Sequence, residues 1–187
     1  MRNAFEWFAR LLDYPGETIR EDARNCMALL IPEASAAAEK IRQFEAFCAA
    51  TGLAKLQELY TKSFDLRPDC TLNASYHLFG DDWRRSIFLA ELKGIYNSSS
   101  FETGSELPDH TCLILEFLGT KGQREQRDEL AEECVIPAVR HILAAMAQEE
   151  NPYKFVLEAL LLWLAASGNL GSAAAEGFHA VRTASST

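Results

Sequence analysis

Three ionisable side chains that lie close together in the sequence have the types that acid–base chemistry requires. Asp109 and His110 follow Pro108, and Glu116 comes seven residues after Asp109 in an otherwise apolar segment that runs to Phe117. Imidazole titrates near neutral pH, and burial shifts the pKa of a carboxyl group toward the same range. The three groups therefore have the chemistry of a general acid–base set.

These residues are expected to share one helix. Proline is tolerated in a first turn because its missing N–H has no helical partner there, so the sequence predicts a helix that begins near Pro108 and ends at Gly119. Asp109 and Glu116 then fall on one helix face. Burying acids beside leucine and phenylalanine is unfavourable without partners, which indicates that the helix borders a cleft. The chain has no nucleophile elbow and no second polar cluster, so partner binding is favoured over catalysis.

Two further segments combine aromatic side chains with acids. Tyr60 and Phe64 are four residues apart, hence on one face of a helix, and Asp65 follows them. Such a pair forms part of a core or lines a groove. Tyr76 and Phe79 precede a pair of aspartates in the same manner. Aromatic surfaces with acidic edges suit a positively charged amphipathic helix lying in a groove.

Charge and length limit the class of protein. The chain has 187 residues, 48% of them hydrophobic, and a formal net charge of −9. This is the composition of one globular domain, which we expect over residues 1–182 with a frayed tail at 183–187. The negative charge makes nucleic acid an unfavourable partner and favours a basic peptide. Arg84 and Arg85 are expected to be solvated or paired with Asp81 and Asp82.

Helical periodicity runs through most of the chain and predicts an all-α fold of nine or ten helices. Pro15, Pro32 and Gly52 separate the first four helices, and Pro68 ends the fourth. Asp82 is expected to cap a helix that continues to Tyr96. Residues 97–105 form a polar loop. The expected later elements are a charged connector at 121–126, a helix at 130–146 that Pro137 kinks, a central apolar helix that begins at Asn151-Pro152, and an Ala-rich segment carrying Phe178 and Val181.

Cysteine and histidine patterns argue against metal binding. The five cysteines contain no C-x-x-C pair, and most have apolar neighbours, which is typical of buried reduced thiols in a cytoplasmic protein. The four histidines lack metal-ligand spacing. The N-terminus has no signal-peptide core, and the longest apolar run, 155–166, is shorter than the ~20 residues that span a bilayer. We therefore expect a cytoplasmic protein that does not span the membrane and binds no metal.

Several of these motifs occur together, and in order, in one family of proteins. The chain resembles the nitrate-reductase molybdenum-cofactor assembly chaperones, the delta-subunit branch of the redox-enzyme maturation chaperones, from about residue 10 to 165. The segments that carry the resemblance are Leu11-Leu12-Asp13-Tyr14-Pro15, Leu59-Tyr60 through Phe64-Asp65, His77-Leu78-Phe79-Gly80, Glu106-Leu107-Pro108-Asp109-His110 and Leu115-Glu116-Phe117. The family usually continues with Leu-Pro after Asp-His, whereas Thr111-Cys112 follows here.

The resemblance implies a non-enzymatic role. Such a chaperone binds the unfinished catalytic subunit of a membrane-associated molybdoenzyme, here a respiratory nitrate reductase, including its N-terminal segment, which resembles a twin-arginine leader. It holds this client for insertion of bis-molybdopterin guanine dinucleotide and binds no cofactor stably itself. A small acid–base enzyme and a generic helical peptide-binding regulator are the alternatives, and the oligomeric state stays open. The client-binding residues expected from the resemblance and the motifs are Tyr60, Phe64, Asp65, Tyr76, Phe79, Glu106, Leu107, Pro108, Asp109, His110 and Glu116.

Overall fold

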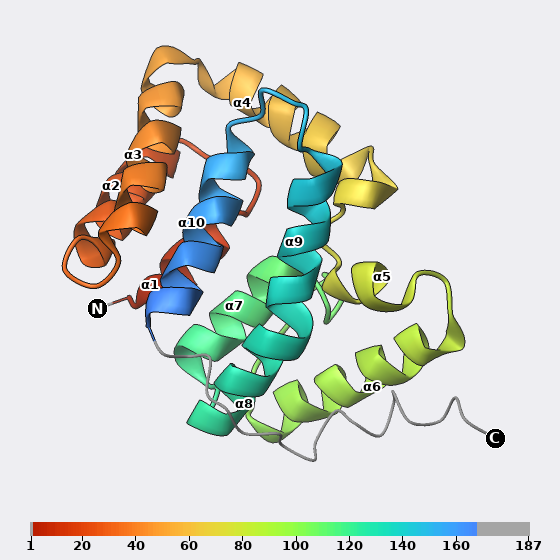
Figure 1. Cartoon of the computed structure of the whole chain (residues 1–187). Coiled ribbons are helices and arrows are strands. Elements are labelled where there is room, and N and C mark those ends of the chain that lie inside the picture. The colour runs from red at the N-terminus through yellow and green to blue at the C-terminus, as the bar shows by residue number, and fades with distance from the viewer. Residues whose placement is uncertain (1, 168–187) are drawn as a thin grey trace.

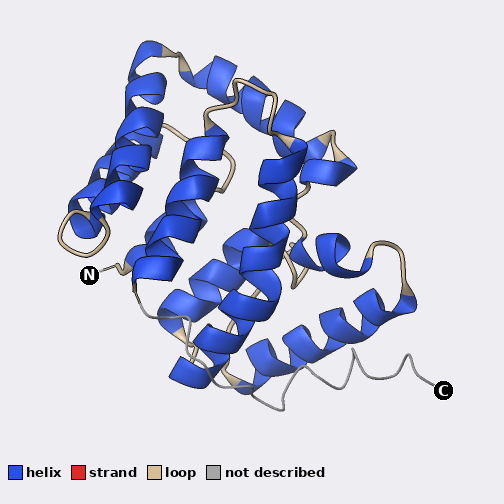
Figure 2. Cartoon of the chain, in the orientation of Figure 1, coloured by secondary structure: helices blue, strands red, loops and turns tan. Residues whose placement is uncertain are grey.

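The computed structural model describes residues 2–167, and helices account for nearly all regular structure in that range (Figure 2). The predicted all-α class is confirmed: residues 2–167 contain no β-strand, only an isolated bridge between Asn73 and His110. The α-helices in this range are α1 (Ala4–Leu11), α2 (Ile19–Leu30), α3 (Ser35–Ala50), α4 (Leu53–Tyr60), α5 (Ala74–Phe79), α6 (Trp83–Ser98), α7 (Thr111–Thr120), α8 (Arg124–Leu130), α9 (Ile136–Ala145) and α10 (Tyr153–Ala166). The expected segment at Phe178 and Val181, the boundary at 182 and the tail 183–187 lie outside the described residues.

The core surrounds α10, which is apolar on nearly all sides. It packs against α3, α9 and α1, and Figure 1 shows it between α3 and α9. Trp163 on α10 contacts Phe5 of α1 edge-on, with ring centroids 4.7 Å apart, and also lies against Phe8. Buried residues from Ala4 to Leu164 form a single cluster. The predicted central position of this helix is therefore confirmed.

The N-terminus is attached to the end of α7 by a cap. The side chain of Asn3 accepts a hydrogen bond from Glu6 N–H (3.2 Å), and the Glu6 carboxylate accepts one from Asn3 N–H (2.8 Å), which forms a capping box. Asn3 Nδ2 also donates to the carbonyl of Gly119 (2.6 Å). A Cβ atom at Gly119 would lie only 2.7 Å from Glu6 Cγ, so glycine permits this close approach of α1 and α7.

Short π-helical turns interrupt two helices. One, Thr61–Asp65, continues α4, and the other, Ala131–Val135, joins α8 to α9. Pro137 lies in the first turn of α9 and lacks the N–H that an α-helical hydrogen bond needs, while Ile136 N–H bonds to the carbonyl of Ala131. The predicted irregularity at Pro137 thus takes the form of a π turn just before it.

One predicted connector was partly wrong. Residues 124–126, expected as a charged linker, belong to α8, because the side chain of Gln126 accepts a hydrogen bond from Gln123 N–H (3.1 Å) and so caps the helix start. By contrast, α6 begins as predicted, since the carboxylate of Asp82 accepts a hydrogen bond from Arg84 N–H (2.9 Å). The predicted polar loop at 97–105 was partly wrong, because α6 extends through Ser98; residues 99–105 are not helical.

The cysteines are unpaired, as predicted. All five lie in the described part of the chain; Cys112 is half-buried and the other four are buried. Burial raises the pKa of the Cys70 thiol to about 11 and that of Cys48 to about 12, so both remain protonated at neutral pH. Within residues 2–167, every helix is too short or too polar to cross a membrane.

Candidate functional site

A short antiparallel bridge holds the segment before α7. The N–H of Ala74 donates to the carbonyl of Asp109 (2.9 Å), and the N–H of Thr111 donates to the carbonyl of Leu72 (2.8 Å). The hydroxyl of Thr111 donates to the same Leu72 carbonyl (2.7 Å). These three bonds join the segment before α5 to the segment before α7, and they bring two sequence-predicted regions side by side.

The bridge corrects the predicted start of the motif helix. His110 is held in an extended conformation (φ −62°, ψ 125°), and α7 begins only at Thr111. Pro108 therefore lies outside the helix, where its carbonyl accepts a hydrogen bond from the Tyr96 hydroxyl (2.9 Å). Since Asp109 also precedes α7, it does not share a helix face with Glu116, and that prediction was wrong.

The carboxylate of Asp109 is buried in a polar cluster. It has no exposed surface, and its Oδ2 accepts a 2.5 Å hydrogen bond from the Ser75 hydroxyl. Arg85 is the counter-ion, with Nη2 3.8 Å from the same oxygen and Nε donating to the Ser75 hydroxyl (3.2 Å). The guanidinium also lies over the Tyr76 ring, 5.7 Å from its centroid. Asp109 thus ties α5 and α6 to the segment before α7 and is not a surface residue.

The two neighbouring arginines of α6 behave differently. Arg84 pairs with Asp82, with Nε 3.1 Å from the carboxylate, as the sequence predicted. Arg85 was expected to be solvated or paired in the same way, and this was wrong, because the buried carboxylate of Asp109 attracts it instead.

Two adjoining pockets open beside this cluster, with volumes of about 290 and 260 Å³. We call them together the groove. The residues that line the groove are Tyr60, Phe64, Asp65, Leu66, Arg67, Pro68, Thr71, Leu72, Asn73, Tyr76, Arg85, Glu106, Leu107 and His110. Most of the sequence-predicted binding residues are therefore brought together here.

The floor of the groove is aromatic and largely buried. Tyr60 and Phe64 are 5% and 3% exposed, and their rings contact one another (centroids 5.1 Å apart) and Tyr153 of α10. The Tyr60 hydroxyl donates to the carbonyl of Leu12 (3.1 Å). The π turn carries Phe64 into this cluster. Tyr60 and Phe64 are thus core residues whose edges also reach the groove. The sequence had offered these two roles, core and groove lining, as alternatives.

Carboxylates dominate the charge at the groove. Asp65 and Glu106 are exposed and form no ion pair within the described part of the chain, whereas Arg67 pairs with Asp69 (2.9 Å) and Arg85 with Asp109. Burial lowers the pKa of the His110 imidazole, and nearby acids, chiefly Glu106, oppose this shift. A neutral imidazole between unpaired carboxylates leaves a negative potential, which attracts cations.

Some residues near the groove escaped the sequence-based prediction. Tyr14 is 52% exposed and its ring meets Tyr60 edge-on, with centroids 5.4 Å apart. Asp13 is exposed and is one of the acids that oppose the lowering of the His110 pKa by burial. Leu66, directly after the π turn, is 69% exposed. The motif Leu11-Leu12-Asp13-Tyr14-Pro15 contained the signal for the first two, since its acid and aromatic stand beside a helix-breaking proline.

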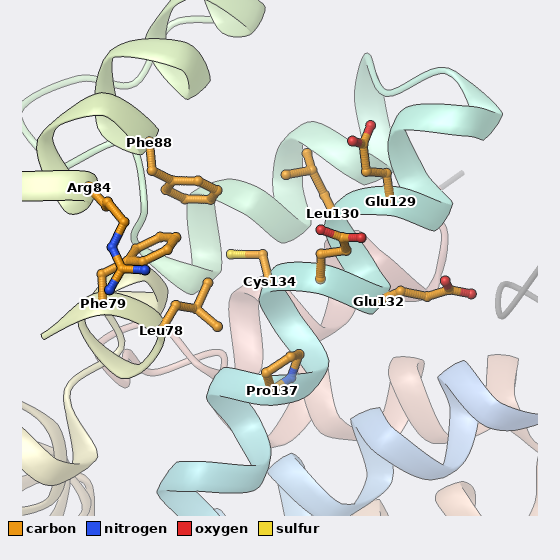
Figure 3. Close-up of a pocket in the computed structure, with 10 residues that line it drawn as sticks. Leu78, Phe79, Arg84, Phe88, Glu129, Leu130, Glu132, Cys134 and Pro137 are labelled. Atoms are coloured by element: carbon orange, nitrogen blue, oxygen red, sulfur yellow. The ribbon is translucent and has the colours of Figure 1, made fainter. Parts of the chain in front are cut away.

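Four of the predicted residues do not line the groove: the buried Asp109, described above, and three others. Pro108 is half-buried beneath Tyr96, and Phe79 lines a separate pocket of about 600 Å³ (Figure 3). Glu116 is exposed and lines a third pocket, of about 240 Å³, together with Arg10.

The positions of Asp109, His110 and Glu116 argue against the alternative of an acid–base enzyme. Asp109 is buried, His110 faces the groove and Glu116 lines a different pocket, so the three side chains surround no common cavity. General acid–base catalysis needs its groups within hydrogen-bond reach of the same reacting atoms. Residues 2–167 also contain no group of three or more His, Cys, Asp or Glu side chains arranged to hold a metal ion.

Comparison with known proteins places the chain in a family and gives two similar proteins. A relative named nitrate reductase molybdenum cofactor assembly chaperone NarJ, from Escherichia coli K12, is 26% identical over 162 residues, which cover 82% of this chain and 66% of the relative. The protein of the same name from Escherichia coli O157:H7 aligns to the same extent. The chain thus spans just under two thirds of the length of these relatives. The model of one family, described as nitrate reductase delta subunit, matches residues 32–166, so the chain belongs to the nitrate reductase delta subunit family.

Proposed function

We propose that this protein is a cytoplasmic assembly chaperone for the catalytic subunit of a membrane-associated molybdoenzyme, a respiratory nitrate reductase. Its groove binds the N-terminal, leader-like segment of that subunit and holds the subunit for insertion of the molybdenum cofactor. Family membership and the names of the relatives support the chaperone class. The single observation that supports the binding site is an aromatic-floored groove beside two unpaired carboxylates, Asp65 and Glu106.

The groove has the chemistry that a cationic amphipathic segment requires. Leu107 is 46% exposed and Leu66 69% exposed, so apolar area is available for burial by a partner at roughly 25 cal/mol per Å². A micromolar complex needs only about 8 kcal/mol net, and a few anchor residues supply most of the energy of such interfaces. Asp65 and Glu106 add preference for lysine or arginine and speed the encounter.

Asp109 acts in this proposal as a positioning residue. Its buried carboxylate holds Ser75 and Arg85, and Arg85 lies over Tyr76, which lines the groove. The bridge from Asp109 and Thr111 to residues 72–74 sets the position of Leu107 and His110 relative to the opposite wall. Asp109 therefore affects client binding through the shape of the groove and not by direct contact.

Calorimetric titration with N-terminal peptides of molybdoenzyme catalytic subunits from the same genome tests the proposal. We expect saturable binding to one leader. The double variant Asp65→Asn/Glu106→Gln removes two charges at nearly constant shape, and we expect it to weaken that binding about three- to tenfold. The matched control is Glu21→Gln/Glu33→Gln, which removes the same charge from exposed positions that do not line the groove.

Three results would contradict the proposal. The first is that no leader peptide binds. The second is that the two double variants weaken binding equally, which would attribute the loss of affinity to net charge alone. The third is that a scrambled peptide of the same composition binds as tightly as the leader. The last result would favour the generic helical peptide-binding regulator, since only a dedicated chaperone distinguishes its client from a peptide of equal charge.

A further inference from the structure

A further pocket lies apart from the groove. It has a volume of about 600 Å³, within the range of roughly 300–1,000 Å³ typical of ligand sites. One wall comes from α5 and α6, and the other from α8, the π turn Ala131–Val135 and α9. Figure 3 shows Leu78, Phe79 and Phe88 on the first wall facing Leu130 and Cys134 on the second. The floor of this pocket is therefore apolar.

The π turn shapes the second wall. A π turn inserts an additional residue into a helical turn, and such turns occur frequently at functional sites. Here Cys134 lies within the π turn, and Figure 3 shows its sulfur directed toward Phe88 across the pocket. Pro137, which lines the same wall, provides the local reason for the turn because it lacks an N–H.

The charged side chains around the pocket leave an excess of negative charge. Among the described residues, Arg84 is the one arginine that lines this pocket; it is paired with Asp82 and lies over the Phe79 ring, 5.8 Å from its centroid. Glu132 and Glu133 also line the pocket, are half-exposed, and form no ion pair within residues 2–167. In Figure 3 the carboxylate of Glu132 points outward, away from Phe79 and Phe88. The rim is thus acidic while the floor is apolar.

Two exposed apolar side chains on α6 adjoin the residues that line the pocket. Trp83 is 60% exposed and Ile87 36% exposed, and they stand four residues apart on α6, next to the pocket-lining Arg84 and Phe88. Tryptophan is among the residues most enriched at the centre of protein interfaces, and large exposed apolar patches mark such sites. Because Trp83 and Ile87 each stand one residue before a pocket-lining residue of α6, the pair lies on the adjacent face of that helix.

We propose that the pocket and this pair form a second docking site for polypeptide, separate from the groove. Its occupant is a cationic amphipathic helix: one large apolar side chain enters the pocket, a second covers Trp83 and Ile87, and lysine or arginine meets Glu132 and Glu133. The charge complementarity of the unpaired glutamates selects this occupant over a neutral or acidic segment. The site does not depend on the function proposed for the groove.

The probe is a 15-residue helical peptide with leucine and phenylalanine on one face and lysine on the other, carrying a benzophenone at its central apolar position. It is photo-cross-linked to the full chain and titrated by calorimetry into the Asp65→Asn/Glu106→Gln variant, in which the groove is weakened. We expect cross-links at residues 78–88 and 130–137. Adding Glu132→Gln/Glu133→Gln is expected to weaken the remaining binding about three- to tenfold.

Controls separate this site from general attraction to an acidic protein. Adding Glu21→Gln/Glu33→Gln to the same background changes net charge equally and is expected to leave the affinity unchanged. Trp83→Ser/Ile87→Ser tests the apolar part on an exposed face and is expected to remove most of the binding. Cross-links confined to groove residues, equal effects of the two glutamate pairs, or equal binding of a peptide with glutamate in place of lysine would each overturn the proposal. These outcomes do not depend on whether a leader peptide binds the groove, so the two proposals can fail separately.

Discussion

The hydroxyl of Ser75 on α5 donates a 2.5 Å hydrogen bond to the carboxylate of Asp109, which precedes α7, and both side chains are completely buried. This bond and the ion pair to Arg85 fix the segment that carries Leu107 and His110 against α5 and α6. A buried carboxylate is tolerated only with such partners, since desolvation otherwise costs several kcal/mol. The pair therefore links the stability of the fold to the shape of the groove.

Replacing Ser75 tests this link. Ser75→Ala removes the hydroxyl donor and leaves a buried carboxylate oxygen without its partner, so we expect the free energy of unfolding to fall by about 1–3 kcal/mol in chemical denaturation. The control is Ser86→Ala on the exposed face of α6, which is expected to change stability by less than about 0.5 kcal/mol. Equal effects of the two substitutions would contradict a structural role for the Ser75–Asp109 bond.

The contact between α1 and α7 gives a second prediction. Gly119→Ala places a methyl group 2.7 Å from Glu6 Cγ and 2.9 Å from Asn3 Oδ1, within a capping box that cannot move freely. We expect a loss of about 1–3 kcal/mol, measured by denaturant titration, as for other overpacked contacts. Gly94→Ala on α6 has open space around the new methyl group and is expected to stabilise by about 0.5–1 kcal/mol. An unchanged free energy of unfolding for Gly119→Ala would show that the capping box shifts to make room for the methyl group.

Local sequence patterns were sufficient for the helices but not for the start of α7. Apolar periodicity and breakers such as Pro15 and Gly52 act within a few residues, so the all-α class and most helix limits followed from them. Pro108 is compatible with a first turn, yet hydrogen bonds to Leu72 and Ala74, far earlier in the chain, hold the segment extended. Tertiary pairing of this kind leaves no local signal.

The same distinction applies to the groove. The four-residue spacing of Tyr60 and Phe64 correctly predicted a shared face, because spacing on a helix determines direction. The sequence did not indicate that Arg85 would turn to Asp109 and not to the adjacent aspartates, because that choice depends on which carboxylate is buried. Exposure of Tyr14 likewise depends on how the α1–α2 connection passes Tyr60.

His110 predicts a dependence of stability on pH. Burial lowers the pKa of its imidazole below the ordinary value of 6.5, so below about pH 6.5 the unfolded chain binds a proton more readily than the folded protein. The stabilisation is complete above that pH and is lost as pH falls toward the folded pKa. In denaturant titrations, we expect the unfolding free energy of the wild type to fall more steeply with acid than that of His110→Gln, by at most about 1.4 kcal/mol per pH unit. Identical slopes would show that His110 is solvated.

Leu107 tests whether apolar burial, and not charge alone, contributes to client binding at the groove. Leu107 is 46% exposed at the groove, and Leu162 on α10 is 39% exposed but does not line the groove. Because about half of Leu107 is already buried, a client that covers the rest gains about 0.7–1.4 kcal/mol, so Leu107→Ser is expected to weaken leader binding about three- to tenfold in calorimetry. Leu162→Ser makes the same chemical change and is expected to leave the affinity unchanged. Both variants should melt within a few degrees of the wild type, because neither side chain belongs to the buried core. Equal affinities of the two variants would mean that the client passes outside the groove.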